Sequence, residues 1–310
     1  METLEEVMAK YKLTKEDHDR IGQEIISIVL HDKYPVENPQ AIIDIAPPAS
    51  GKTGLNAYGT EQFIDKNVVI INSDEFKPFH PHIEEIAKLY PEYYTKVTDQ
   101  ESNTWTSNLF DFALSNGYNI IFEGPGRNAR ILNTIREKMQ NHTVTVRGMS
   151  VNELNCLMSI LERYELQVRT KGWGRLVTLD HFYQTYNNMP ETIDEIEKSG
   201  VVDFVEVFRR GDKPSRPKKV YSSDVKDNSI PSAKSAVLKG RLDDKEGALK
   251  SFYEKRDFLK KLIRENGDNP EVSKIINRIM DIVIALEDRT HTVNPNPANV
   301  DNSDLGNSER

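Results

Sequence analysis

The sequence of 310 residues holds a single cysteine, so no disulfide can form within the chain. That scarcity is typical of proteins from a reducing compartment. Cys156 lies between Leu154 and Leu157, and we expect it in the core rather than as a nucleophile. Long apolar stretches are also absent. None approaches about 18 residues, so we expect no membrane span. The N-terminal residues are acidic and do not have the pattern of a signal peptide.

An excess of positive charge is missing as well. The formal net charge is −8, which argues against a general binder of nucleic acid or of anionic membranes. Hydrophobic residues make up 37% of the chain and charged residues 29%, as in ordinary globular proteins. A chain of this length can form one large domain or two smaller ones.

The most informative stretch is APPASGKT at residues 46–53, which fits the P-loop pattern G-x-x-x-x-G-K-[ST] except at its first position. The apolar run 41–45 before it predicts a short buried strand, and a helix can begin at about Gly51. A strand, a tight loop and a helix N-terminus form a cradle for an anion, because backbone N–H groups and the helix dipole favour negative charge. Lys52 would reach the β- and γ-phosphates of ATP, and Thr53 would ligate Mg²⁺.

This loop departs from the pattern in ways that affect its chemistry. Pro47 and Pro48 have no N–H to donate, and Ala46 adopts positive φ less readily than glycine. The ATP cradle must therefore use the amides of five consecutive residues, which are Ala49, Ser50, Gly51, Lys52 and Thr53. The alternative is a chance loop that contains the common triplet Gly-Lys-Thr.

Further βα repeats follow the P-loop. Strands are predicted at 67–72, 119–122 and 144–149, which implies an α/β fold with a parallel sheet flanked by helices and right-handed crossovers. Asp74 follows the first of these strands, so it would face the P-loop ligand as a general base. Ser73 or Asp74 could also cap a helix, and the two roles can coexist. Glu123 follows the next strand, where a carboxylate that organises Mg²⁺ is expected.

Two arginines are candidates for binding the transferred phosphate. Arg163 lies in a predicted helix at 151–169, and Arg175 lies in the Gly-Trp-Gly-Arg stretch that breaks this helix. The alternative for Arg163 is ordinary helix charge, paired with Glu162 or Glu165.

The rest of the chain predicts mostly helices. We expect helices at 179–187 and 191–198, a fifth strand at 204–208, a basic loop or hairpin at 209–240, and a helical hairpin formed by 242–263 and 272–286. The organisation predicted from this is an N-terminal helical segment that packs on the core (1–40), a kinase domain (41–225), a helical hairpin extension (226–289) and a disordered tail (290–310).

The ordered set of motifs resembles the zeta toxin family, over about residues 20–225. Besides the P-loop, the motifs are NSDEFK at 72–77, HP at 80–81, YNIIFEGPGR at 118–127, LERYE at 161–165 and YSS at 221–223. The resemblance implies a fold like that of small P-loop kinases. It also implies an ATP- and Mg²⁺-dependent kinase that phosphorylates the 3′-hydroxyl of the amino sugar of UDP-N-acetylglucosamine, as the toxin of a bacterial toxin–antitoxin pair.

The resemblance also assigns roles to matching residues. Asp74 would be the catalytic base, with Lys52, Arg163 and Arg175 acting on the phosphates. The nucleotide sugar would contact Asp74, Phe76, His80, Glu123, Pro125 and Arg127, and Thr53 and Glu123 would hold Mg²⁺, the latter directly or through water. A small helical antitoxin would cover the ATP site. The implied location is the bacterial cytoplasm, with delivery as a secreted effector left open.

Several residues depart from the family pattern. Ala46 and Ala49 replace glycines, Pro125 replaces a threonine that can donate to substrate, and Ser107 stands where some members carry a glutamate. Two alternatives follow from these departures. One is a kinase for another hydroxyl, such as an NAD ribose or an antibiotic, and the other is a degenerate P-loop module that binds without catalysis.

Overall fold

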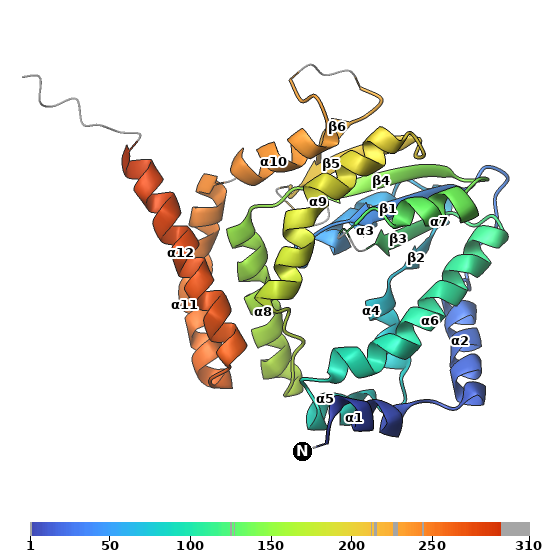
Figure 1. Ribbon diagram of the computed structural model, residues 1–310, viewed down its shortest axis with the longest axis horizontal. Coiled ribbons are helices and arrows are strands. Elements are labelled where there is room, and N and C mark those ends of the chain that lie inside the picture. The colour runs from blue at the N-terminus through green and yellow to red at the C-terminus, as the bar shows by residue number, and fades with distance from the viewer. Residues whose placement is uncertain are drawn as a thin grey trace, which may run out of the picture.

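A six-stranded sheet forms the centre of the computed structural model (Figure 1), which describes residues 2–124, 126, 128–211, 213, 216–225, 229–243 and 245–292. The strands are ordered β2-β3-β1-β4-β5-β6. Their bounds are β1 Gln40–Ile45, β2 Val69–Ile71, β3 Ile120–Gly124, β4 Thr143–Met149, β5 Phe204–Arg209 and β6 Lys218–Ser222. The first five are parallel, as predicted, and β6 pairs antiparallel with β5 at one edge.

The P-loop strand lies in the middle of this sheet. Five of the six residues of β1 are buried, because helices cover both faces of the sheet. The chain leaves β1 for β2 on one side, returns through β3, and then crosses to β4 on the other side. The carboxyl end of β1 is therefore the point at which the strand order reverses, and open α/β sheets bind their ligands at such a point.

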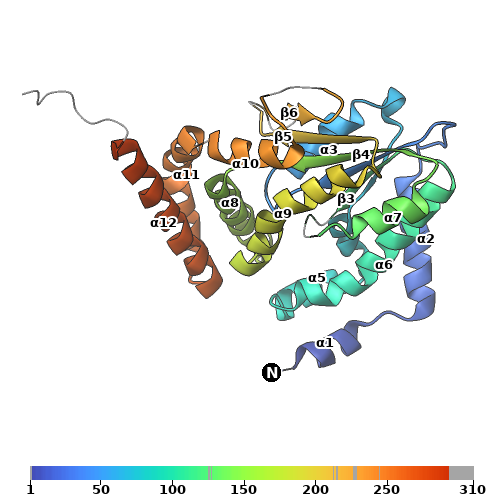
Figure 2. The same cartoon turned by 45° about the horizontal axis from the view of Figure 1, so that its top comes forward.

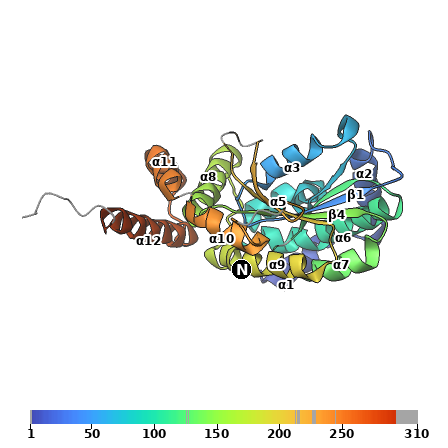
Figure 3. The same cartoon turned by 90° about the horizontal axis from the view of Figure 1, so that it is seen from above.

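The helices form a layer on each face of the sheet (Figure 3). One face is covered by α3, Lys52–Thr60. The other face packs against α6, α7, α9 and α10, which span Tyr94–Ser115, Ile131–Lys138, Leu179–Ser199 and Ala233–Asp243. Within β1, Ile43 and Ile45 join the large core on this second face, whereas Ile42 packs with Val68 and Ile121 on the α3 side.

The two helices predicted at 179–187 and 191–198 are one helix, and that prediction was wrong. Pro190 lies inside α9 without ending it. A proline there removes one backbone hydrogen bond. The helix survives because its apolar face, which includes Met189 and Ile193, is fully buried against the sheet, and the contact is close because Gly148 of β4 lacks a side chain.

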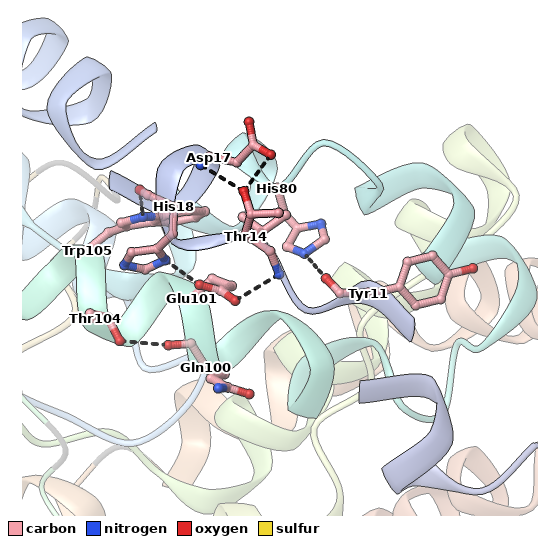
Figure 4. A network of polar contacts seen from close by, with 10 residues as sticks. Tyr11, Thr14, Asp17, His18, His80, Gln100, Glu101, Thr104 and Trp105 are labelled. Carbon is pink, nitrogen blue, oxygen red and sulfur yellow. Dashed lines mark hydrogen bonds and ion pairs between the residues drawn. The ribbon is translucent and has the colours of Figure 1, made fainter. Parts of the chain in front are cut away.

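The N-terminal segment is helical, as predicted, and forms two helices, α1 (Leu4–Tyr11) and α2 (Lys15–Val29). Thr14 caps α2 by accepting a hydrogen bond from the backbone N–H of Asp17. Figure 4 shows how α2 is joined to α6. His18 pairs with Glu101 and stacks on Trp105, whose indole N–H donates to the carbonyl of His18 at 2.9 Å.

The C-terminal region is helical, as predicted, but it starts earlier. Instead of a loop up to residue 240, α10 begins at Ala233, and it is followed by α11 (Lys245–Asn266) and α12 (Pro270–Thr292). In Figures 1 and 2, α11 and α12 lie beside α8 (Glu153–Lys171), on the side away from the sheet. They share an apolar cluster with α8 that includes Leu161, Leu259 and Ile275.

The remaining elements are short. They are η1 (Ile64–Lys66), α4 (Ser73–Phe76), η2 (Lys77–Phe79) and α5 (Ile83–Leu89). The predicted tail overlaps the end of α12 at residues 290–292, and residues 293–310 lie outside the described part. The division into four segments stays a prediction. None of the described helices combines the length and the apolar character needed to cross a membrane.

Candidate active site

The P-loop joins β1 to α3 through two residues with left-handed backbone. Gly51 caps the helix with φ of 109°, and Ala49 has φ of 57°. The conformational strain expected at Ala46 therefore falls on Ala49, where a left-handed residue other than glycine costs about 1–2 kcal/mol. Lys52 extends back over the loop, and its Nζ donates to the carbonyl of Ala46 at 3.3 Å. Burial lowers the pKa of Lys52, while the nearby carboxylates of Glu123 and Asp74 oppose that shift.

An arginine that the sequence did not single out braces this loop. Arg210 follows β5, and its guanidinium donates to the carbonyls of Ser50 (3.2 Å) and Ala49 (2.6 Å) and to Ser159 Oγ (3.1 Å). These contacts tie the carbonyls of the loop to the end of β5 and to α8. They also add positive charge beside an anion cradle.

A cleft of about 1980 Å³ opens in front of the P-loop, between α4, α6 and α8. It brings together most of the predicted site residues, which are Ala49, Gly51, Lys52, Thr53, Asp74, Glu123, Arg163 and Arg175. Ser107 also lines it. Ser50 is fully buried within the loop and does not line the cleft, and its backbone N–H donates to the Pro47 carbonyl at 3.3 Å.

Asp74 lies at the start of α4, where it is paired with two cationic side chains. Asn72, rather than Ser73 or Asp74, caps this helix, because its side chain accepts from the Asp74 N–H at 3.0 Å. Asp74 Oδ1 lies 2.5 Å from Arg175 Nη1 and 3.0 Å from Lys77 Nζ. Burial alone would raise the pKa of Asp74, but the charges and hydrogen bonds of Arg175 and Lys77 outweigh burial and hold it below its ordinary value. Asp74 is therefore ionised, and its pairing with Arg175 and Lys77 makes it a weaker base than a free aspartate.

Glu123 is the penultimate residue of β3 and lines the cleft, where its side chain is held in place. Asn56 of α3 donates to Glu123 Oε1 at 2.6 Å. Thr53 and Glu123 thus offer a hydroxyl and a carboxylate oxygen to one cleft. Among the described residues no group of three or more His, Cys, Asp or Glu could hold a metal. The pair of oxygens from Thr53 and Glu123 suits Mg²⁺, which is usually held by one or two protein oxygens, with waters and phosphate oxygens completing its shell.

The strand before the P-loop carries a further carboxyl group, Asp44, which was not predicted to be functional. Asp44 of β1 is fully buried, and neither oxygen has a hydrogen-bond partner in the described part of the chain. Burial raises the pKa of Asp44 to about 7, although the charge of Arg147 on β4 opposes this. Hydrophobic patterning hid this residue, because it lies inside the apolar run that defines the strand.

The two arginines reach the cleft from α8 and the loop after it. The acids offered as alternative partners of Arg163 are engaged elsewhere. Glu162 pairs with Lys255 at 2.5 Å, and Glu165 accepts from Asn266 at 2.5 Å. The alternative of a simple helix ion pair for Arg163 therefore finds no support in this geometry.

The loop that carries Arg175 is tightly fitted. Gly172 ends α8 with φ of 77°, and Trp173 crosses to the ring of Tyr94 on α6, with centroids 5.0 Å apart. Gly174 packs directly on α8, and the backbone N–H of Arg175 donates to Gln167 Oε1 at 2.9 Å. These contacts place the guanidinium against Asp74.

The other predicted substrate contacts are placed differently. Phe76 is buried in the main core and His80 is 1% exposed, so neither side chain lines the cleft. His80 Nδ1 accepts from the His82 N–H, and its Nε2 therefore carries the proton and donates to the Tyr11 carbonyl at 3.2 Å (Figure 4). Pro125 and Arg127 lie outside the described residues.

The fold and this cleft together define a P-loop phosphotransferase. The P-loop, the Asp74 carboxylate and two arginines, Arg163 and Arg175, meet at the carboxyl edge of a parallel sheet. The family model described as zeta toxin matches residues 11–225. Because this match spans more than half of the chain, the protein belongs to the zeta toxin family, and the resemblance read from its motifs is confirmed.

Similar proteins agree with this assignment. Toxin zeta of Streptococcus agalactiae is 27% identical over 199 residues, which are 63% of this chain and 69% of that protein. Toxin PezT of Streptococcus pneumoniae is 22% identical over 181 residues, covering 57% of this chain and 71% of PezT. A solved structure from the PezAT toxin–antitoxin system of that species has a TM-score of 0.67 at 19% identity, covering 80% of this chain and 98% of that one. At this identity the likeness supports the fold alone.

Proposed function

We propose that the chain is an ATP-dependent kinase that phosphorylates the 3′-hydroxyl of the amino sugar of UDP-N-acetylglucosamine. The observation that carries the proposal is the cleft in which Lys52, Asp74, Arg163 and Arg175 face one another. Family membership supports the reaction class, and the motif resemblance supports the acceptor. The chemistry needs only a base, cations around the phosphates and close positioning, because phosphoryl transfer relies mainly on orientation and charge stabilisation.

The reaction follows from the positions of these groups. The backbone amides of residues 49–53 and Lys52 hold the β- and γ-phosphates of ATP. Asp74 accepts the proton of the acceptor hydroxyl as its oxygen attacks the γ-phosphorus, and the bond from that phosphorus to the β–γ bridging oxygen breaks. ADP leaves with the bonding electrons. Arg163 and Arg175 balance the negative charge of the transferred group. Thr53 and Glu123 would hold Mg²⁺, which neutralises phosphate charge when bound.

In the structure Arg175 is paired with Asp74, so ATP must draw the arginine toward phosphate before the base is fully available. Lys52, now hydrogen-bonded to Ala46, must likewise turn toward the nucleotide. Both movements exchange a contact within the protein for a charge-assisted contact to phosphate.

The setting that we propose is the toxin half of a toxin–antitoxin pair in a bacterial cytoplasm, with a small helical antitoxin that covers the ATP side of the cleft. The relatives named as toxins and the solved PezAT system support this part. Co-purification of the chain with the product of an adjacent small gene, and loss of ATP binding in the complex, would test it.

The acceptor is tested with ATP, Mg²⁺ and a panel of hydroxyl compounds that includes UDP-N-acetylglucosamine, NAD and an aminoglycoside. We expect one phosphorylated product, from UDP-N-acetylglucosamine, by mass spectrometry. ATP binding by calorimetry separates two failures. Normal binding without this product would overturn the acceptor, whereas absence of ATP binding would overturn the kinase and favour a binding module.

A further inference from the structure

Lys77 is a buried lysine that joins two carboxylates at the edge of the cleft. It follows α4 directly, and its side chain is 3% exposed, against 46% for Asp74 and 39% for Asp99. Its Nζ lies 3.0 Å from Asp74 Oδ1 and 2.6 Å from Asp99 Oδ1 on α6. A buried ammonium is stable only when it is well paired, so these two carboxylates fix its position.

Asp74 receives two cations on the same oxygen, and they differ in how far they are exposed. Arg175 comes from the loop after α8, and its side chain is 26% exposed. Lys77 is anchored beneath α4 by Asp99 and is enclosed by protein. When phosphate draws Arg175 away, Lys77 remains on Oδ1. Oδ2 is then the oxygen that faces an incoming hydroxyl.

We infer that Lys77, held by Asp99, is the positioning residue for the base. It fixes the orientation of the Asp74 carboxylate so that Oδ2 receives the proton of the acceptor hydroxyl. This inference rests on the proposed function, in which Asp74 is the base. Lys77 touches neither the acceptor nor the transferred phosphate in this scheme, since its ammonium is occupied by the two carboxylates.

The charges around Asp74 give Lys77 and Asp99 effects of opposite sign. Lys52 of α3 and Arg163 and Arg175 from the α8 side add positive charge near Asp74, as does Lys77 from its own segment. On α6, Asp99 brings negative charge through its bond to Lys77, and Tyr94 lies close by. Loss of the lysine charge raises the pKa of Asp74, whereas loss of the Asp99 charge lowers it or leaves it unchanged.

The kinetic test compares Lys77→Met and Asp99→Asn in the full chain. We expect Lys77→Met to lower kcat about ten- to a hundredfold, because the base loses its orientation. KM for ATP stays at the wild-type value. The acid limb of the pH–rate profile moves up by about one to three pH units. Lys77→Arg, which keeps the charge, recovers part of kcat. Lys96→Met, an exposed lysine of α6 outside the cleft, keeps wild-type kinetics.

Asp99→Asn provides the second variant, should Lys77→Met fail to fold. A lower kcat with an acid limb at or below the wild-type position supports the inference, because a merely structural change would not separate the two effects. Wild-type kcat in Asp99→Asn, or an upward shift of the acid limb in both variants, overturns it. Wild-type kcat and an unmoved acid limb in Lys77→Met overturn it as well.

A measurement without turnover separates this inference from the proposed function. The carboxyl carbon of Asp74 is followed by ¹³C NMR, with its signal identified by its loss in Asp74→Asn. In the wild type we expect a carboxylate signal throughout the acid range in which the protein stays folded. In Lys77→Met, we expect the pKa of Asp74 to rise by about one to three units, so that its titration enters the range in which the protein stays folded. If the wild type phosphorylates no acceptor, the proposed function fails, yet this titration still decides whether Lys77 controls Asp74.

Discussion

Gly174→Ala tests the position of Arg175, because it should displace this arginine without changing its guanidinium group. A Cβ added at Gly174 would lie 2.7 Å from the backbone carbonyl oxygen of Tyr164 and 2.9 Å from its ring. Ordinary contact begins at 3.4 Å, so the loop must move by about 0.7 Å, since the backbone of α8 cannot yield. Arg175 is the next residue and would move with the loop. Displacement by about 1 Å at a catalytic group can cost about a hundredfold in rate.

We therefore expect Gly174→Ala to lower kcat about ten- to a hundredfold. The Kd for ATP should change little, because the P-loop is not altered. Steady-state phosphorylation of UDP-N-acetylglucosamine and ATP calorimetry measure the two effects. Gly172→Ala is the matched control in the same loop. Its φ of 77° strains an alanine by about 1 kcal/mol, but the new Cβ meets no atom within 4 Å. Wild-type kcat in Gly174→Ala, or an equal loss in both variants, would refute this account of the loop.

Three further predictions concern buried polar groups. Asn266→Ala removes hydrogen bonds to the carbonyl and the carboxylate of Glu165 at 3.0 and 2.5 Å, so the free energy of unfolding in urea should fall by about 1–3 kcal/mol. Asn188→Ala, at an exposed position, should change it very little. Burial raises the pKa of Asp44 to about 7, so the folded protein binds this proton more tightly than the unfolded chain, and Asp44 lowers the stability as the pH rises from its unfolded pKa toward 7. Asp44→Asn should therefore stabilise the protein more at pH 8 than at pH 5. An equal effect at both pH values would contradict the shift. Burial raises the pKa of the Cys156 thiol to about 12, so an aromatic disulfide reagent at pH 8 should react with it only on unfolding, and rapid reaction of the native protein would place Cys156 at the surface.

The layout of the fold was predictable because it depends on local patterns. Apolar runs that end in Asp74 and Glu123 marked strands, and their carboxyl ends meet at one edge whatever the detailed packing. Local rules failed where tertiary packing overrode them. Two helices were predicted at 179–187 and 191–198, yet the buried face of α9 keeps one helix through Pro190.

The same limit explains which site residues were missed. Asp99 belongs to the cleft only because α6 crosses α4, and Arg210 reaches the P-loop only because β5 ends near β1 and β4, so neither has a motif of its own. Lys77 lies three residues after Asp74, and this helical spacing could have suggested their contact. His80 differs in the opposite direction, because its motif match predicts a substrate contact whereas the structure buries it against the N-terminal segment.

The most direct test of the central claim is the product formed from ATP, Mg²⁺ and UDP-N-acetylglucosamine by the wild type and by Asp74→Asn. The substitution keeps the shape of the side chain and removes the base. The account predicts that ³¹P and ¹H NMR will show a phosphate on the 3′-hydroxyl of the amino sugar with the wild type. It also predicts a loss of rate of about a hundredfold or more, with ATP still bound, for Asp74→Asn. Phosphorylation at another position, or an Asp74→Asn variant as fast as the wild type, would contradict it.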